Sequence, residues 1–230
     1  MSQIVSVTSW PVAYTQRGYF KFFPTGSNRP AGRRTVVVRI ADDAGYEGWG
    51  QAVPSPRWSY ETPESVRSAL DHYLGPELIG VDVDDAGTIE RRLNAAIAPS
   101  FSIGMPIAKA GIDLALWELR SRRHGVSVAQ HIANEYPEFT PTDHPVTLSW
   151  TINVRTLDEL NAQLANARER GYRHFNVKVA PDSSFDLELC RRVRAASPDG
   201  FLWADANGGY DLAAALEIVA ALGRSGLRRS

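Results

Sequence analysis

Hydrophobic and polar residues follow strand-like patterns in two stretches near the start of the chain. Residues 3–9 (QIVSVTS) alternate with a period of two, and residues 35–41 (TVVVRIA) form a β-branched run, both typical of β-strands. The second stretch leads through a turn at 42–45 into the segment GYEGWGQAV. Between the two stretches lies a long segment, 13–34, without a regular pattern. Segments of this length are typically functional or disordered.

The period changes to that of a helix after the first 60 residues. Thr62 is predicted to cap a helix that has a proline at its first position and apolar residues at intervals of four. Two further helices are predicted at about 84–97 and 106–123. Together, the strands and helices indicate an α+β domain, residues 1–136, followed by a connector that contains Pro and Thr, residues 137–145.

The second part of the chain alternates strands and helices. The strands VTLSWTIN, HFNVKV and FLWAD are each followed by a helical pattern, and the first helix opens with the capping box TLDE at 156–159. Short links between strand and helix imply parallel strands joined by right-handed crossovers. Three such units fit either a doubly wound sheet or a (β/α)8 barrel, and periodicity does not separate the two.

Polar residues at the strand ends favour the barrel. Lys178 ends the second of these strands, and Asp205 and Asn207 follow at the end of the third. Catalytic groups of barrels gather at the carboxyl ends of the strands. A doubly wound nucleotide fold would show a glycine-rich turn after its first strand, whereas the segment here, NVRTLDEL, contains no glycine. The predicted fold class is therefore α/β, with residues 146–230 forming the first three βα units of a (β/α) TIM-type barrel.

The strand HFNVKV has a polar face. Alternation places His174, Asn176 and Lys178 on one side and three apolar residues on the other. Such a strand is either half exposed to water or lines a site. From the residues alone both readings stay open, because a strand-end lysine can reach solvent and His174 can pack or hydrogen-bond within the fold. Asp205 and Asn207 can likewise open a turn and cap the next helix.

The composition excludes several classes of protein. The 230 residues are 43% hydrophobic and 22% charged, and a net charge of −1 gives no reason to expect nucleic acid or an anionic membrane as a partner. Cys190 stands alone, which excludes a disulfide framework within the chain and a cysteine metal site. The first residues lack the features of a signal peptide, and no segment has the roughly 18 apolar residues of a membrane span. We therefore expect a soluble, cytoplasmic protein.

Four motifs in order resemble one known family. They are the turn GYEGWGQA, the helix AKAGIDLALWELRSRRHGVSV, the strand with NVKV and the strand with DAN. Their order and spacing, over about residues 3–222, resemble the mandelate racemase and muconate lactonizing enzyme branch of the enolase superfamily. The resemblance implies an α+β capping domain and a modified (β/α) barrel. It also implies that Mg²⁺ is bound and that a proton α to a carboxylate is removed to give an enolate.

The resemblance assigns roles to the strand-end residues. Lys178 matches the second lysine of the family's KxK motif, which implies a general base, and Asp205 matches the first of three acidic metal ligands. Asn207 lies where the family often contacts its substrate. These residue types suit the chemistry, because carboxylates are the hard oxygen ligands that Mg²⁺ prefers and a divalent cation offsets the charge of an enolate.

Other positions are expected to contact the substrate. Asn176 stands where the family usually has the first lysine, which helps to hold the substrate carboxylate. The segment 15–34, with Tyr19 and Phe20 as candidate substrate contacts, and the turn 54–61 match the cap loops that close the site. Aromatic tips and a few cations suit a loop that excludes water from an anionic substrate.

The chain departs from the family pattern in its length. A (β/α)8 domain has about 250 residues, and residues 146–230 supply about 85. The remaining metal ligands and the acid or base on the opposite face are expected beyond residue 230. We expect a Mg²⁺-dependent enzyme that acts on a small-molecule carboxylate by racemisation, elimination of water or cycloisomerisation, and that forms a homo-oligomer. The alternative is a catalytically inactive, truncated fragment that is only structural or oligomer-forming.

Overall fold

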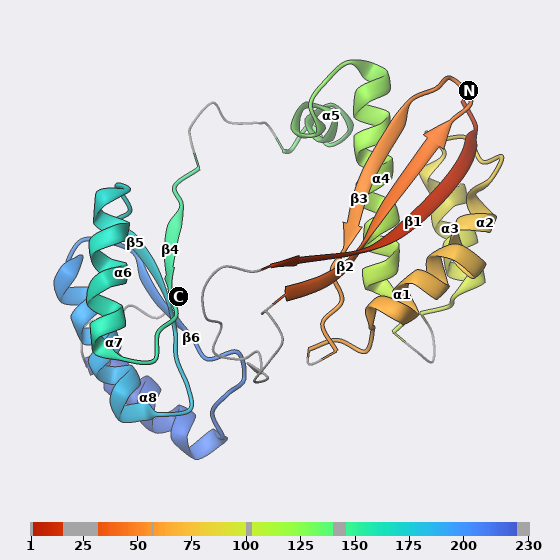
Figure 1. Ribbon diagram of the computed structural model, residues 1–230. Coiled ribbons are helices and arrows are strands. Elements are labelled where there is room, and N and C mark those ends of the chain that lie inside the picture. Colours follow the sequence, from red (N-terminus) through yellow and green to blue (C-terminus); the bar gives the residue numbers. More distant parts are fainter. Residues whose placement is uncertain (1, 16–31, 57, 100–102, 140–145, 225–230) are drawn as a thin grey trace. The chain divides into compact units, whose positions relative to one another are not determined.

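The computed structural model describes residues 2–15, 32–56, 58–99, 103–139 and 146–224. These residues form two compact units (Figure 1). Unit 1 contains the described residues up to 139, and unit 2 contains residues 146–224. Among the described residues, no helix is both long enough and apolar enough to cross a membrane.

Unit 1 is built on a three-stranded antiparallel sheet with β2 in the middle. The strands are β1 (Ile4–Thr15), β2 (Gly32–Asp42) and β3 (Glu47–Ala52). Alternation along β2 sends Val36, Val38 and Ile40 to one face, where all three are fully buried. This face carries the core of the unit.

The other face of the sheet carries an aromatic pair. Trp10 of β1 and Trp49 of β3 stack with ring centroids 5.7 Å apart and an interplanar angle of 22°. The guanidinium of Arg39, on the central strand, lies 5.5 Å from the centroid of Trp10 and 6.0 Å from that of Trp49. Both indoles are more than a third exposed, so this face meets solvent.

Helices pack on the buried face of the sheet. Those that contact its strands are α1 (Pro63–Ala69), the π-helical turn η1 (Leu70–Leu74), α2 (Gly75–Leu78) and α4 (Pro106–His124). α3 (Ala86–Ala96) packs on α2 and η1, and α5 (Val128–Glu135) packs on α4. A Cβ atom at Gly50 would lie 2.0 Å from the Gly111 carbonyl oxygen of α4, and one at Gly48 would lie 2.0 Å from that of Ala115. These glycines therefore let β3 and α4 approach backbone to backbone.

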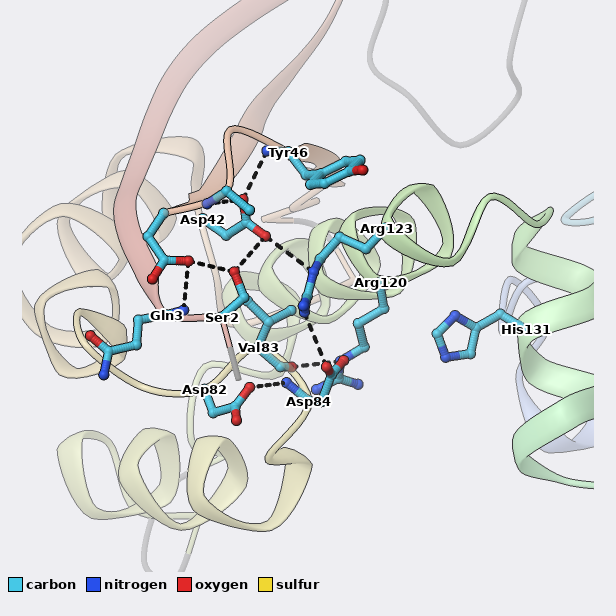
Figure 2. A network of polar contacts seen from close by, with 12 residues as sticks. Ser2, Gln3, Asp42, Tyr46, Asp82, Val83, Asp84, Arg120, Arg123 and His131 are labelled. Carbon is cyan, nitrogen blue, oxygen red and sulfur yellow. Dashed lines mark hydrogen bonds and ion pairs between the residues drawn. The ribbon is translucent and has the colours of Figure 1, made fainter.

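A polar network joins the end of β2 to α4 (Figure 2). Asp42, the last residue of β2, accepts hydrogen bonds from the Ser2 hydroxyl at 3.0 Å and from the backbone amide of Tyr46 at 2.8 Å. Arg123 of α4 lies with Nε 3.2 Å from Asp42 Oδ2 and with Nη1 3.0 Å from Asp84 Oδ2. The carboxylate of Asp42 is thus surrounded by donors from three parts of unit 1.

Unit 2 has three parallel strands in the order β4-β5-β6, and each strand precedes a helix. The strands are β4 (Ser149–Ile152), β5 (His174–Lys178) and β6 (Leu202–Asp205), and the helices are α6 (Leu157–Glu169), α7 (Ser183–Ala196) and α8 (Leu212–Arg224). The helices lie on one face of the sheet, and a second apolar core fills the space between them and the strands (Figure 1). The predicted alternation of parallel strands and helices is confirmed.

β1 and β2 are longer than the sequence pattern predicted. Their ladder continues to the pair Thr15 and Gly32, so residues 13–15 and 32–34 belong to strands rather than to the irregular segment predicted at 13–34. A ladder is held by backbone hydrogen bonds, which form whatever the side-chain pattern, and this is why alternation missed these residues. Residues 16–31 lie outside the described part of the chain.

The helix that Thr62 caps is interrupted. Thr62 caps it as predicted, because its side chain accepts the backbone amide hydrogen bond of Ser65 at 3.1 Å. The helix then passes through η1, where the amide of Gly75 donates to the carbonyl of Leu70, five residues earlier. Pro76 follows and has no N–H to continue an α-helical ladder, which explains the change of register.

Two helix starts differ from the prediction. α5 was not predicted, although Ser127 precedes Gln130 by three residues and its hydroxyl accepts the Gln130 amide hydrogen bond at 3.1 Å. At α6, Thr156 accepts the amide of Glu159 at 3.2 Å as predicted. The carboxylate of Glu159 accepts from the amide of Arg155 at 2.7 Å, so the return bond of the capping box is made one residue earlier.

Candidate active site

Lys178, Asp205 and Asn207 meet at the carboxyl ends of β5 and β6. Lys178 and Asp205 are direct neighbours in the parallel register of the two strands. Lys178 Nζ lies 2.6 Å from Asp205 Oδ2 and 3.1 Å from Asn207 Oδ1. The structure therefore brings together three of the side chains that the sequence indicated as a site.

Strand alternation explains the direction of Lys178. Phe175, Val177 and Val179 enter the apolar core of unit 2 and are at most 4% exposed. Lys178 projects from the opposite face, the face that also carries Asn176. Its side chain is 11% exposed, and its ammonium group contacts oxygens of the neighbouring strand end rather than extending into solvent.

A tight turn after β6 brings Asn207 back toward Lys178. Asp205 Oδ1 accepts a hydrogen bond from the Asn207 backbone amide at 2.9 Å, and Asn207 has a φ of 47°. Asparagine tolerates this left-handed conformation better than most residues with a side chain. Asp205 therefore opens a turn, but the cap of α8 is Asp211, whose side chain accepts from the amide of Ala214 at 2.9 Å.

The environment of Asp205 keeps its carboxyl group ionised at neutral pH. Burial raises the pKa of this group, but the hydrogen bonds from Lys178 and from the Asn207 amide, with the Lys178 charge, outweigh burial. The net pKa of Asp205 lies below its ordinary value. Its side chain is 34% exposed, so this anionic group is also open to solvent.

Asn176 and His174 lie farther from the strand end. The Oδ1 atom of Asn176 is buried and has no hydrogen-bond partner in the described part of the chain. His174 begins β5, and its Nδ1 accepts the backbone amide hydrogen bond of Phe201 at 2.9 Å. Lys178 lies four positions farther along the strand, about 13 Å away, so His174 lies at the amino end of the sheet.

The predicted cap loops are described only in part. Tyr19 and Phe20 lie outside the described residues. In the turn 54–61, the amide of Ser59 donates to the carbonyl of Ser55 at 2.7 Å, and Tyr60 is 87% exposed. The side chain of Tyr60 therefore faces solvent.

Two polar residues beside the site were missed from the sequence. Asp186 of α7 is fully buried, and its Oδ2 accepts a hydrogen bond from the hydroxyl of Tyr210 at 2.5 Å. The sequence contained a signal for the buried position of Asp186. This residue lies three and four positions before Leu189 and Cys190, on the apolar stripe of α7. A charged residue at such a position needs a partner within the fold.

The oxygen atoms at the strand ends fit part of a Mg²⁺ site. Asp205 offers a carboxylate and Asn207 an amide oxygen, both of the hard type that Mg²⁺ prefers. Across the described ranges, no group of three or more His, Cys, Asp or Glu side chains is close enough to hold a metal ion. Asp205 is therefore one candidate ligand, and a complete acidic ligand set is not found among these residues.

Two hollows in the described surface lie away from these side chains. One, of about 440 Å³, is in unit 1 and is lined by Asp84, Arg120, His124 and His131 among others. The other, of about 520 Å³, lies near the amino ends of β5 and β6. Neither is lined by Lys178 or Asp205. The convergence of base, acid and amide at the strand ends, rather than the size of a hollow, identifies the candidate site.

Both units match models of known domain families. Residues 27–133 match the mandelate racemase / muconate lactonizing enzyme N-terminal domain. Residues 159–228 match the enolase C-terminal domain-like family. The second match contains Lys178, Asp205 and Asn207, so the candidate site lies within a family domain.

Characterised relatives and a solved structure extend these matches. The chain is 26% identical over 182 residues to o-succinylbenzoate synthase of Bacillus subtilis, covering 78% of this chain and 45% of that protein. It is 27% identical over 194 residues to L-Ala-D/L-Glu epimerase of Clostridium acetobutylicum, covering 84% of this chain and 51% of that protein. The muconate lactonizing enzyme of Pseudomonas putida matches with a TM-score of 0.77 at 23% identity, over 98% of this chain and 58% of that one.

These comparisons confirm the predicted fold class. The chain has the fold of an N-terminal α+β domain followed by the first βα units of a TIM-type barrel. It spans about half the length of the curated relatives it matches.

Proposed function

We propose, since this chain belongs to the mandelate racemase and muconate lactonizing enzyme branch of the enolase superfamily, that Lys178 removes a proton α to the carboxylate of a small-molecule substrate. The observation that carries the proposal is the contact of Lys178 Nζ with Asp205 and Asn207 at the carboxyl ends of adjacent strands. Known relatives include a synthase, an epimerase and a lactonizing enzyme. The proposal therefore concerns the proton-transfer step rather than one overall reaction.

Each residue of the site has a defined part in this step. Lys178 acts as the base in its neutral form, after its ammonium group has lost a proton, and the two oxygens that contact its Nζ fix the direction from which it meets the substrate. Asn176 lies on the same strand face and has a buried Oδ1 without a partner among described residues, which leaves an acceptor for a donor group of the substrate. The turn after β6 fixes Asn207, whose side chain contributes a second polar contact to the substrate.

Mg²⁺ is the proposed cofactor, with Asp205 as one ligand. When bound, it supplies positive charge that offsets the charge developing on the substrate carboxylate during proton removal. Asp205 suits this role because its carboxyl group is ionised and its side chain is 34% exposed.

Exchange of substrate protons with solvent tests the proposal. The 230-residue chain is incubated in D₂O with Mg²⁺ and a panel of sugar acids, amino-acid derivatives and hydroxy acids, and loss of the α-proton signal is followed by ¹H NMR. We expect α-proton exchange with at least one class of acid. In Lys178→Ala we expect the exchange rate to fall by about 100-fold or more, which is the scale of a lost general base.

Lys178→Arg is the matched variant for the role of the base. Arginine keeps the positive charge beside Asp205 but does not lose its proton at neutral pH. We expect Lys178→Arg to be as inactive as Lys178→Ala in the exchange experiment. Exchange at the unmodified rate in Lys178→Arg would contradict the assignment of Lys178 as base.

A second candidate function is that of a catalytically inactive chain with a structural or oligomer-forming role. One observation favours it: among the described residues, Asp205 stands without two further acidic side chains to complete a metal site. This candidate predicts no α-proton exchange with any acid of the panel. It also predicts no rise in melting temperature when Mg²⁺ is added.

A further inference from the structure

A buried carboxylate lies between the two loops that carry the candidate site. Asp186, in the first turn of α7, is fully buried. Its Oδ2 accepts a hydrogen bond from the backbone amide of Ala180 at 2.6 Å and another from the hydroxyl of Tyr210 at 2.5 Å. The hydroxyl of Tyr210 in turn accepts from the same Ala180 amide at 3.1 Å. The three groups form a closed junction.

The junction connects the segments that follow β5 and β6. Ala180 lies two residues after Lys178, and Tyr210 lies three residues after Asn207. The loop after β5 and the loop after β6 are therefore tied to each other through Asp186, within a few residues of the site. A shift of either loop would change the distance between Lys178 and its partners across the strands.

The conformation of Ala180 indicates that this tie is needed. Ala180 has a φ of 77°, in the left-handed region that residues with a Cβ atom disfavour. Such a conformation persists only where the surrounding structure holds it. Here its amide is held by both Asp186 and Tyr210.

The chemistry of the pair suits a permanent junction. A buried carboxylate is unfavourable unless donors satisfy it, and Asp186 is satisfied by an amide and a phenol. Burial, together with the hydrogen bond and the negative charge of Asp186, raises the pKa of Tyr210 above its ordinary value. Tyr210 therefore keeps its proton at neutral pH and remains a hydrogen-bond donor.

We infer that Asp186 and Tyr210 are positioning residues, which join the loop after β5 to the loop after β6 and thereby hold Lys178 against Asp205 and Asn207. They act through the backbone at Ala180 and through the turn after β6. The importance of Asp186 and Tyr210 for catalysis rests on the proposed function. Their effect on the contact between Lys178 and Asp205 is independent of the proposed function.

The experiment compares crystal structures of the unmodified full chain and of Tyr210→Phe, obtained at the same pH. Tyr210→Phe removes one hydroxyl and no charge. If the junction positions Lys178, its Nζ atom no longer lies within hydrogen-bonding distance of Asp205 Oδ2 in Tyr210→Phe, whereas the two atoms are 2.6 Å apart in the unmodified chain. Hydrogen exchange of the Ala180 amide is expected to become about tenfold faster, because one of its acceptors is lost.

Tyr172→Phe is the matched control. Tyr172 lies in the same unit, where its ring packs edge-on against Trp150 with centroids 5.1 Å apart. Its hydroxyl has no part in the junction, so we expect the distance between Lys178 and Asp205 and the Ala180 exchange rate to stay unchanged. An unchanged contact between Lys178 and Asp205 in Tyr210→Phe, even with a lower melting temperature, would overturn the inference and leave a purely structural role.

Asp186→Asn provides a second variant, because it changes the group that accepts from both the Ala180 amide and the Tyr210 hydroxyl. Loss of the contact between Lys178 and Asp205 in Asp186→Asn supports positioning, and an unchanged contact contradicts it. Asp158→Asn, which removes an exposed charge from the first turn of α6, controls for the change in net charge.

The test separates this inference from the proposed function. It uses no substrate, so loss of the contact between Lys178 and Asp205 in Tyr210→Phe supports positioning even if no acid in the panel exchanges its α-proton. If exchange is found but this contact is unchanged in Tyr210→Phe, the proposed function stands and the positioning role is wrong. Should Tyr210→Phe fail to fold, Asp186→Asn decides.

Discussion

Each unit ends a strand with an aspartate that pairs with a cation, but the two pairs lie in different surroundings. Asp42, at the end of β2, has a fully buried side chain and accepts four contacts, from Ser2, Ala44, Tyr46 and Arg123 (Figure 2). Asp205, at the end of β6, is 34% exposed and accepts one hydrogen bond on each oxygen from the described residues.

The difference separates a structural carboxylate from a candidate ligand. A carboxylate has about four lone-pair sites, and the contacts of Asp42 occupy all of them. Asp205 keeps capacity for a further partner and is reachable from solvent. An acidic residue at a strand end is therefore not by itself a sign of function. The number of its filled contacts and its exposure distinguish the two cases.

The largest effect is expected from Asp42→Asn. The substitution replaces a saturated carboxylate with an amide and leaves Arg123, whose side chain is 19% exposed, without its buried counter-charge. We expect the free energy of unfolding, measured by urea denaturation, to fall by about 3 kcal/mol or more, the scale of a broken buried ion pair.

Asp84→Asn is the control for this variant. Asp84 contacts the same Arg123, but its side chain is 46% exposed. We expect its substitution to cost about 1 kcal/mol or less. Equal losses of unfolding free energy in Asp42→Asn and Asp84→Asn would contradict the distinction between saturated and solvent-exposed carboxylates.

A smaller effect is expected from separating Lys178 and Asp205. Lys178→Met and Asp205→Asn, alone and together, form a double-mutant cycle whose coupling energy measures the ion pair. We expect a coupling of up to about 1 kcal/mol, since one partner is a third exposed. A coupling of about 3 kcal/mol would place this pair in the same class as Asp42 and Arg123.

The smallest effect is a difference in acid sensitivity. Burial raises the pKa of Asp205, and the contacts with Lys178 and the Asn207 amide lower it further than burial raises it, so the folded value lies below the unfolded one. The stability that this group contributes is present above its unfolded pKa of about 3.9 and is lost as the pH falls through the folded pKa.

Denaturant unfolding between pH 5 and the lowest pH at which the chain is folded measures this difference. Other carboxyl groups with lowered pKa values, including Glu188, titrate in the same range, so the comparison is between the unmodified chain and Lys178→Met. We expect the unmodified chain to lose slightly more stability on acidification. Identical pH profiles would show that the contact adds nothing to folding.

The sequence predicted the features that depend on periodicity and on caps. Alternation along β5 indicated that Lys178 and Asn176 share a face, and the short links indicated parallel strands. It could not indicate the junction of Asp186 and Tyr210, because their contact spans 24 residues and depends on how two loops fold. The π-helical turn before Pro76 was missed for a related reason, since a change of hydrogen-bond register leaves the apolar spacing intact.

The aromatic pair on the outer face of unit 1 gives that unit an optical label. Two indoles stacked 5.7 Å apart couple their electronic transitions, so Trp10 and Trp49 should produce a paired positive and negative band in circular dichroism. In unit 2, Trp150 contacts Tyr172 and Trp203 contacts Phe201, and these mixed pairs absorb at different wavelengths and couple weakly. Loss of the paired band would therefore report on unfolding of the sheet of unit 1 alone, although both units belong to the same chain.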